Sequence, residues 1–355
     1  MNQAVQALQQ ALVEQSMDAM FITSFPNRYY VTGLHSTAGV ALVTPNKAWF
    51  LVDFRYVEAA ENTISGMEVE MCNKGQFARI AELMAENGVK RLGFEEESMS
   101  YAEYRRLAEA APGVELCPFQ SALEKLRQVK RPDELERIRQ AQRIGEQAFG
   151  EILNYIRPGV TERQIRTELE YAMQKAGGEG LAFDTIVVSG VNSSMPHGMP
   201  TDKPVEPGDF VTMDFGCTWQ GYCGDMTRTV AVGHVTDEMR QVYDTVLRAQ
   251  QKALEGIRAK LTGHEIDALA RDVIDAAGYA FCFGHSLGHS LGIEVHEKPS
   301  FSVGYGYGIP AGAVMSVEPG IYLPGQFGVR IEDLVVVRED GAENLNSSPK
   351  ELIVL

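Results

Sequence analysis

Two aspartates lie on either side of a predicted hairpin turn, at positions that face each other across the hairpin. Asp214 stands in Val-Thr-Met-Asp214-Phe-Gly, Asp225 stands in Gly-Asp225-Met-Thr-Arg-Thr-Val, and the turn is predicted at Trp219-Gln220-Gly221. A hairpin symmetric about residues 219 and 220 pairs residue 214 with residue 225. Partners on one face have Cβ atoms about 5 Å apart, so the two carboxylates should point the same way at close range.

Two glutamates repeat this arrangement farther along the chain. Glu318 in Ser-Val-Glu318-Pro-Gly and Glu332 in Val-Arg330-Ile-Glu332-Asp333 flank the predicted turn Leu323-Pro324-Gly325-Gln326. The midpoint of their numbers is residue 325, inside the turn, so this hairpin also places two carboxylates side by side. A β-bulge in either hairpin would change the pairing, but two hairpins that give the same result rarely arise by chance.

The strands that carry these acids are otherwise apolar. An isolated acidic pair usually lies on the exposed face of a hairpin, but acids inside apolar strands need a partner because an unpaired buried charge is costly. Two divalent cations would neutralise the four carboxylates, so the sequence predicts a dinuclear metal site. The apolar neighbours are Phe210, Val211, Met213, Phe215, Val314, Met315 and Val317.

Three of the seven histidines fall in one short segment, Gly284-His285-Ser-Leu-Gly-His289-Ser-Leu-Gly-Ile-Glu-Val-His296-Glu297. Glycine at every fourth position lets the backbone approach closely, which serves packing as well as a site. One histidine among four carboxylates makes an oxygen-rich site that suits manganese, cobalt or iron better than a thiolate zinc site. Two such ions about 3.5–4 Å apart can hold a hydroxide between them. These residues alone fit any two-metal hydrolase, a phosphatase included.

The elements that must position these residues lie in the second part of the chain. Strands are predicted at 184–189, 210–215, 224–232, 314–319 and 329–337, and helices at 236–258 and 263–276. A long helix is predicted at 133–156, before Arg157-Pro158-Gly159, and another begins at Thr161-Glu162. Strands and helices in separate blocks predict an α+β domain with an antiparallel sheet.

The first part of the chain alternates helical and strand patterns. Strands are predicted at 19–23, 39–44, 48–52, 91–94 and 114–116, with helices at 76–87 and 101–110, which indicates a small α/β domain. A helical segment then leads to Lys130-Arg131-Pro132-Asp133, where proline favours a boundary. We divide the chain into an N-terminal domain, residues 1–125, and a catalytic domain, residues 126–355.

With these motifs the chain resembles the pita-bread-fold (creatinase/methionine aminopeptidase-like) metallopeptidases, in the branch of Xaa-Pro aminopeptidases and Xaa-Pro dipeptidases (prolidases). The resemblance rests on the five motifs around Asp214, Asp225, His285-Ser-Leu-Gly-His289, Glu318 and Glu332, and on Asn27-Arg-Tyr-Tyr-Val-Thr-Gly33 and Val52-Asp53-Phe-Arg55-Tyr56 near the N-terminus. It implies a creatinase-like α/β N-terminal domain and a pita-bread catalytic domain with a curved, mainly antiparallel sheet.

The resemblance also implies how the metal ions are held. Asp225 and Glu332 should bridge two divalent ions, most often manganese, with cobalt, iron or zinc as alternatives. Asp214 should bind one ion, and His289 with Glu318 the other. A metal-bridging hydroxide should attack the scissile carbonyl, and Glu318 should act as the proton shuttle to the leaving nitrogen.

Four more residues receive roles from the resemblance. His197, in Ser-Met-Pro-His197-Gly, matches a histidine near the leaving proline. His285 and His296 match residues that contact the substrate and stabilise the tetrahedral oxyanion. Arg330 matches a residue that steadies the carboxylate network. Taken singly, each histidine is more often a hydrogen-bonded structural residue.

One departure from the family pattern bears on the substrate. Members that cleave dipeptides commonly have His-Glu-x-Pro-Arg, where the arginine can hold the dipeptide carboxylate, but this chain has His296-Glu297-Lys298-Pro299-Ser300. We therefore expect an aminopeptidase that removes the residue before proline, with prolidase activity as the alternative. Creatinase, which needs no metal, and non-catalytic binding proteins of the same fold are disfavoured because all five ligand positions are filled.

The composition of the whole chain limits its partners. The net charge of −16 over 355 residues disfavours nucleic acid, and no apolar run approaches the length of a membrane span. The N-terminus lacks the basic start and apolar core of a signal peptide, and the five cysteines form no CxxC pair. We expect a cytoplasmic enzyme with reduced thiols that acts on short proline-containing peptides, and the resemblance implies a homodimer.

Overall fold

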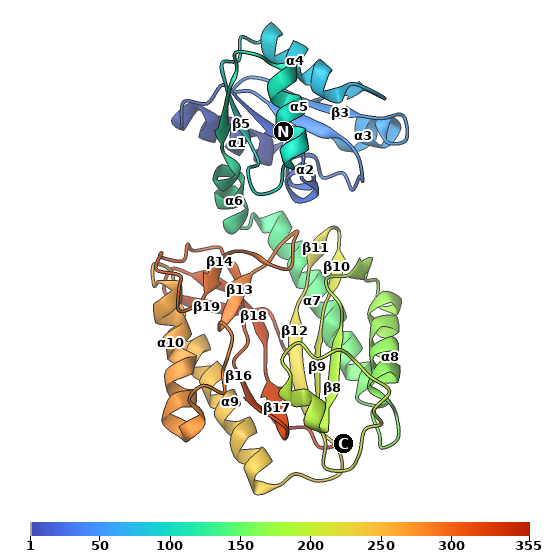
Figure 1. The fold of residues 1–355 in the computed structure, drawn as a ribbon. Coiled ribbons are helices and arrows are strands. Elements are labelled where there is room, and N and C mark those ends of the chain that lie inside the picture. Colours follow the sequence, from blue (N-terminus) through green and yellow to red (C-terminus); the bar gives the residue numbers. More distant parts are fainter. Residues whose placement is uncertain (1) are drawn as a thin grey trace. The chain divides into compact units, whose positions relative to one another are not determined.

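The structure, a computed structural model, describes residues 2–355 of the chain. It divides into two compact units, Met1–Arg127 and Gln128–Leu355, which are described separately (Figure 1). The sequence places the boundary after residue 125. No helix among the described residues is both long and apolar enough to cross a membrane.

The first unit is an α/β domain built on one six-stranded sheet with the strand order β4-β3-β2-β1-β5-β6. The central strand β1 pairs antiparallel with β2 and parallel with β5, so the sheet is mixed. Its strands are β1 Ala19–Ile22, β2 Val40–Val43, β3 Ala48–Val52, β4 Glu68–Met71, β5 Arg91–Phe94 and β6 Glu115–Pro118. Its helices are α1 Gln3–Glu14, α2 Phe25–Thr32, α3 Val57–Thr63, α4 Gln76–Glu86, α5 Tyr101–Ala110 and α6 Gln120–Gln128.

The second unit has antiparallel sheets flanked by two pairs of long helices (Figure 1). The helices are α7 Pro132–Ile152, α8 Glu162–Lys175, α9 Asp237–Gly256 and α10 Gly263–Ile274, with short turns η1 Gly190–Ser194 and η2 Asp275–Tyr279. The strands are β7 Gly180–Leu181, β8 Ile186–Ser189, β9 Phe210–Phe215, β10 Cys217–Trp219, β11 Tyr222–Cys223, β12 Met226–Ala231, β13 Gly288–Ser290, β14 Glu297–Phe301, β15 Val314–Val317, β16 Gly320–Leu323, β17 Phe327–Arg330, β18 Asp333–Arg338 and β19 Gly341–Asn344.

Two hydrophobic cores hold the catalytic unit together. In one core α7 and α8 pack on β8, β9 and β12, and in the other α9 and α10 pack on β15, β17 and β18. Local signals fix where these helices begin. Capping boxes start α8 at Thr161 and α10 at Thr262, and Pro132 occupies the first turn of α7. The two cores therefore fix the positions of the strands whose ends carry the predicted acids.

The predicted elements of this unit are present, but three predicted strands are interrupted at the acids. Strand 224–232 begins at residue 226, strand 314–319 ends at residue 317, and strand 329–337 is two strands, β17 and β18. The interruptions fall at Asp225, at Glu318 and at Glu332. Each of these acids therefore occupies a strand end, where the ladder no longer constrains the backbone. The sequence pattern missed these breaks because apolar strand residues resume within three residues of each acid.

Candidate metal centre

The first acidic pair does not face directly across its hairpin, and the predicted register is wrong by two residues. Asp214 pairs with Thr227, and Met226 pairs with Phe215. The turn consists of Gln220 and Gly221, both with positive φ (44° and 69°), as a two-residue hairpin turn requires. The turn centre lies one residue later than predicted, which moves every partner by two. Asp225 is therefore a diagonal neighbour of Asp214.

The second acidic pair has the predicted register. Val317 pairs with Asp333 between β15 and β18, and Gly320 pairs with Arg330 between β16 and β17. Both ladders share one register, which places Glu318 opposite Glu332. The turn lies at Pro324 to Gln326, inside the predicted segment.

Four carboxylates and His289 line one cavity of about 420 Å³. Asp225, His289 and Glu332 each offer one potential ligand atom, and these atoms all lie within 4.8 Å of one another. The Nε2 atom of His289 is 3.7 Å from Asp225 Oδ2 and 3.4 Å from Glu318 Oε1. The Nδ1 atom of His289 is 3.2 Å from the Ser290 carbonyl oxygen, so Nδ1 donates and Nε2 is left for a ligand.

The carboxylates are buried together, and this shifts their pKa values upward. Burial and the neighbouring acids raise the pKa of Asp225 and of Glu332 well above their ordinary values. Burial, with Asp214 adding to it, raises the pKa of Glu318 to about 7. Burial lowers the pKa of His289, which favours the neutral imidazole that a metal ion requires. Such a cluster binds protons when no cation is present, and a divalent cation would replace them.

The donor set fits divalent metal ions. The Oδ1 atoms of Asp214 and Asp225 are buried and have no hydrogen-bond partner among the described residues. Buried polar atoms are normally hydrogen-bonded, so these two oxygens are available as ligands. Oxygen donors with one imidazole suit manganese, iron or cobalt.

Removal of metal should make stability depend on pH in a predictable direction. A carboxyl group whose folded pKa is raised stabilises the folded protein below its unfolded pKa and loses this contribution as pH rises through its folded pKa. For Glu318 the window runs from about 4.5 to about 7. The chelator-treated protein should therefore gain more from manganese at pH 8 than at pH 5.5, by an amount of the order of 2 kcal/mol from Glu318, because pH 5.5 lies about 1.5 pH units below its pKa.

Thermal melts with and without manganese at both pH values test this expectation. His289 does not oppose the trend, because any protonation of its imidazole at pH 5.5 would also compete with the metal ion. A gain in melting temperature that is equal at both pH values, or larger at pH 5.5, would contradict the proposed carboxylate cluster.

A hydrogen-bond network around Arg330 orients two of the acids. The guanidinium donates to Asp214 Oδ2 (2.6 Å), to the Tyr322 hydroxyl (2.8 Å) and to Thr227 Oγ1 (3.1 Å). Thr227 Oγ1 in turn donates to Glu332 Oε2 (2.7 Å). Arg330 therefore lies between the two hairpins and contacts the acids of both, directly or through Thr227. Sequence reasoning missed Tyr322 and Thr227, although Thr227 follows Asp225 at the spacing of one strand face.

The three other predicted histidines also line the cavity. Both ring nitrogens of His285 are occupied, by the Ser286 carbonyl (2.9 Å) and the Tyr322 hydroxyl (2.9 Å), and burial lowers its pKa to about 4. His296 stacks edge-on against His289 with ring centroids 4.4 Å apart, and burial lowers its pKa. His197 and His296 make no hydrogen bond in the described part of the chain, so both can reach a substrate.

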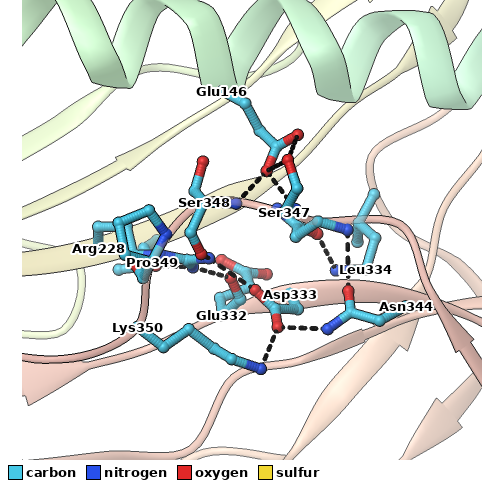
Figure 2. Close-up of polar contacts among 12 residues, drawn as sticks. Glu146, Arg228, Glu332, Asp333, Leu334, Asn344, Ser347, Ser348, Pro349 and Lys350 are labelled. Atoms are coloured by element: carbon cyan, nitrogen blue, oxygen red, sulfur yellow. Dashed lines mark hydrogen bonds and ion pairs between the residues drawn. The ribbon is translucent and has the colours of Figure 1, made fainter.

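A second polar network lies directly behind Glu332 (Figure 2). Arg228 donates to the Glu332 carbonyl (2.5 Å), to Asp333 Oδ1 (2.8 Å) and to the carbonyls of Ser348 and Pro349. The second carboxylate oxygen of Asp333 accepts from Lys350 Nζ (2.8 Å) and Asn344 Nδ2 (2.7 Å). Glu332 thus has its carboxylate in the cavity and its carbonyl held by this network.

Comparison with known proteins agrees with this fold and identifies the family. Residues 136–339 match the profile described as metallopeptidase family M24, and residues 5–129 match that of the Creatinase/Prolidase N-terminal domain. The chain is 36% identical to the Xaa-Pro dipeptidase of Pyrococcus horikoshii over 356 residues, which cover 99% of both proteins.

Solved structures give the same result over the whole length. The Xaa-Pro dipeptidase from Bacillus anthracis superimposes with a TM-score of 0.96 at 42% identity, and 99% of each chain is covered. The X-Pro aminopeptidase from Thermotoga maritima superimposes with a TM-score of 0.92 at 38% identity, again over 99% of each chain. The chain belongs to metallopeptidase family M24 and has its pita-bread catalytic fold.

Proposed function

We propose that this enzyme holds two divalent metal ions and hydrolyses the bond between an N-terminal residue and proline, as an Xaa-Pro aminopeptidase. The observation that carries the proposal is the convergence of Asp214, Asp225, Glu318, Glu332 and His289 on one cavity. The relatives named Xaa-Pro dipeptidase and X-Pro aminopeptidase support proline as the residue after the cleaved bond.

The metal ions would be held by the five converging side chains. We assign Asp225 and Glu332 as the bridging ligands, Asp214 to one ion, and His289 with Glu318 to the other. Manganese is the proposed metal because the donors are mostly carboxylate oxygens. Divalent ions in such a site supply Lewis acidity, which polarises a carbonyl and makes water a stronger nucleophile.

The surrounding side chains handle protons and orientation. Glu318 lines the cavity beside His289, and we assign it to accept a proton from the attacking water and to deliver it to the leaving nitrogen. His197 and His296 have nitrogens available for the substrate and are assigned to the peptide oxygen and the proline side. His285 has both nitrogens occupied, so we assign it to holding Tyr322 and through it Arg330.

The preference for peptides longer than a dipeptide rests on position 300. Ser300 pairs with His289 across β13 and β14, so its side chain lies beside a proposed metal ligand. An arginine here could hold the carboxylate of a dipeptide, but serine carries no charge. A specific observation favours prolidase as the second candidate: the structure with the TM-score of 0.96 is named an Xaa-Pro dipeptidase.

A peptidase assay with manganese distinguishes the two candidates. We expect release of alanine from Ala-Pro-Xaa peptides at higher kcat/KM than from Ala-Pro, and none from Ala-Ala. Ser300→Arg should raise the relative use of Ala-Pro by about tenfold, because one charge-assisted hydrogen bond is worth roughly 1.5–3 kcal/mol. Cleavage confined to Ala-Pro would instead make the enzyme a prolidase, and cleavage of neither proline peptide would reject both candidates.

The N-terminal domain, assembly and location complete the proposal. We assign residues 1–125 to a creatinase-like domain and residues 126–355 to the catalytic domain, and we propose a cytoplasmic homodimer. The negative net charge of −16 argues against a nucleic acid partner. Light scattering on the purified protein measures the assembly directly, and a monomeric mass would refute the dimer.

A further inference from the structure

The geometry points to Lys130 as a positioning residue that holds strand β13, which carries His289, against strand β14, which begins directly after His296. The inference rests on the proposed function for its kinetic consequence, but its structural content is independent of the substrate. Lys130 lies just before α7 and is remote in sequence from both histidines. Its side chain is only 2% exposed, and that of its partner Glu297 is 5% exposed.

The lysine bridges one cross-strand pair. Ser290 on β13 and Glu297 on β14 are register partners, and Lys130 Nζ donates to Ser290 Oγ (3.0 Å) and to Glu297 Oε2 (3.2 Å). The backbone N–H of Lys130 donates to the Gly312 carbonyl (3.0 Å), which fixes where the side chain starts. One ammonium group therefore contacts both strands at the same paired position.

The two histidines are the immediate neighbours of that paired position. His289 precedes Ser290, and His296 precedes Glu297. A register shift lies between His289 and Ser290, and β14 begins only at Glu297, so simple strand alternation does not set the direction of the histidines. The contact that holds Ser290 and Glu297 together instead fixes the two backbone positions next to His289 and His296. Their ring centroids lie 4.4 Å apart, and both residues line the cavity.

Glu297 also shapes the connection between the two strands. Its Oε1 atom accepts from the backbone N–H groups of Ile293 (2.9 Å) and Glu294 (3.2 Å). A Cβ at position 292 would lie 2.8 Å from this oxygen, so the close approach requires Gly292. Glu297 is the unassigned acid of the His296-Glu297-Lys298-Pro299 motif, and these contacts give it a role. Lys130 supplies the positive charge that such a buried carboxylate needs.

The contacts of Lys130 affect the reaction through the positions of His289 and His296. Removal of a residue that holds a metal ligand in place from outside the site typically lowers activity or metal affinity 10–100-fold. Without the contact of Lys130 with Ser290 and Glu297, β13 and β14 can separate at the position next to His289 and His296. The enzyme should then turn over more slowly, with a larger effect on kcat than on KM.

The test compares Lys130→Met with the double variant Lys130→Met/Glu297→Gln. The single variant removes the positive charge beside the buried Glu297 carboxylate and can fail to fold, whereas the double variant removes both charges. In the double variant we expect kcat for Ala-Pro-Xaa to fall about tenfold or more and manganese affinity to fall by a similar factor. In the metal-free protein, amide hydrogen exchange of residues 291–297 should accelerate about tenfold. The matched control is Lys175→Met/Glu151→Gln, an exposed ion pair, which should change none of these.

Two results would overturn the inference. A folded double variant with kcat, manganese affinity and exchange all within twofold of the parent shows that the pair only stabilises the fold. Faster amide exchange with unchanged kcat and metal affinity shows that the placement of His289 and His296 does not depend on the contact of Lys130 with Ser290 and Glu297. If the parent enzyme cleaves no Xaa-Pro peptide, the proposed function fails separately, and the exchange and metal titrations still decide the role of Lys130.

Discussion

Asp225→Asn should lose bound metal and peptidase activity together, with kcat/KM falling at least about 1,000-fold. The asparagine keeps the shape of the side chain but removes the negative charge that we assign to bridging two ions. Loss of several kcal/mol of transition-state stabilisation from the metal ions corresponds to a rate change of this size. Metal analysis and steady-state kinetics on the same preparation measure both quantities.

The variant should nevertheless fold, which makes the result interpretable. Gln142 binds the backbone of Asp225 in both directions, accepting from its N–H (3.0 Å) and donating to its carbonyl (2.9 Å). These contacts do not involve the carboxylate. Burial and nearby acids raise the pKa of Asp225, so the metal-free variant should be at least as stable as the metal-free parent.

Two further variants frame the Asp225 result. Glu332→Gln should behave like Asp225→Asn, because the two residues have equivalent proposed roles. Asp202→Asn, at an exposed aspartate whose side chain is 83% accessible, should leave metal content and kcat/KM unchanged. Full activity in Asp225→Asn would exclude Asp225 as a bridging ligand and with it the dinuclear site.

The acids of the site could be predicted from sequence because their chemistry conflicts with their surroundings. Carboxylates in apolar strands are rare, and two hairpins that share this feature together indicate a metal site. The register of the first hairpin could not be predicted, because it depends on which two residues adopt positive φ. Gln220 and Gly221 do so, whereas the pattern favoured a turn one residue earlier. The second turn, with Pro324 and Gly325, has clearer signals and gives the predicted register.

The residues that support the site were largely invisible in the sequence. Tyr322, Thr227 and Lys130 reach the site through packing between segments that are far apart in the chain, and no local period marks them. The strand β13 was missed as well, because it has only three residues, Gly288, His289 and Ser290, and none of them is a β-branched or large aromatic residue typical of strands. Its neighbours in the sheet, β14 and β15, hold it in an extended conformation.

Arg228→Met should destabilise the catalytic unit by about 3–5 kcal/mol, the usual cost of breaking a buried ion pair. Arg228 is 1% exposed and Asp333 is fully buried. The substitution leaves the Asp333 carboxylate with Lys350 and Asn344 as its partners, and it removes the donor to the carbonyls of Glu332, Ser348 and Pro349 (Figure 2). Burial by itself would raise the pKa of Asp333, and Arg228 is the largest of the influences that instead bring this pKa below its ordinary value.

The expected shift in melting temperature for Arg228→Met is about 10 °C, since 1 kcal/mol corresponds to roughly 2–4 °C in a unit of this size. The control is Arg143→Met on α7, whose side chain is 58% exposed and pairs with Glu136. This substitution should shift the melting temperature by no more than about 2 °C. Because Arg228 also holds the carbonyl of Glu332, manganese affinity should fall along with stability. A variant with parental melting temperature but weakened metal binding would show that the network orients Glu332 without stabilising the fold. A variant with a lowered melting temperature but parental metal affinity would show that Glu332 is positioned by Thr227 and its own strand.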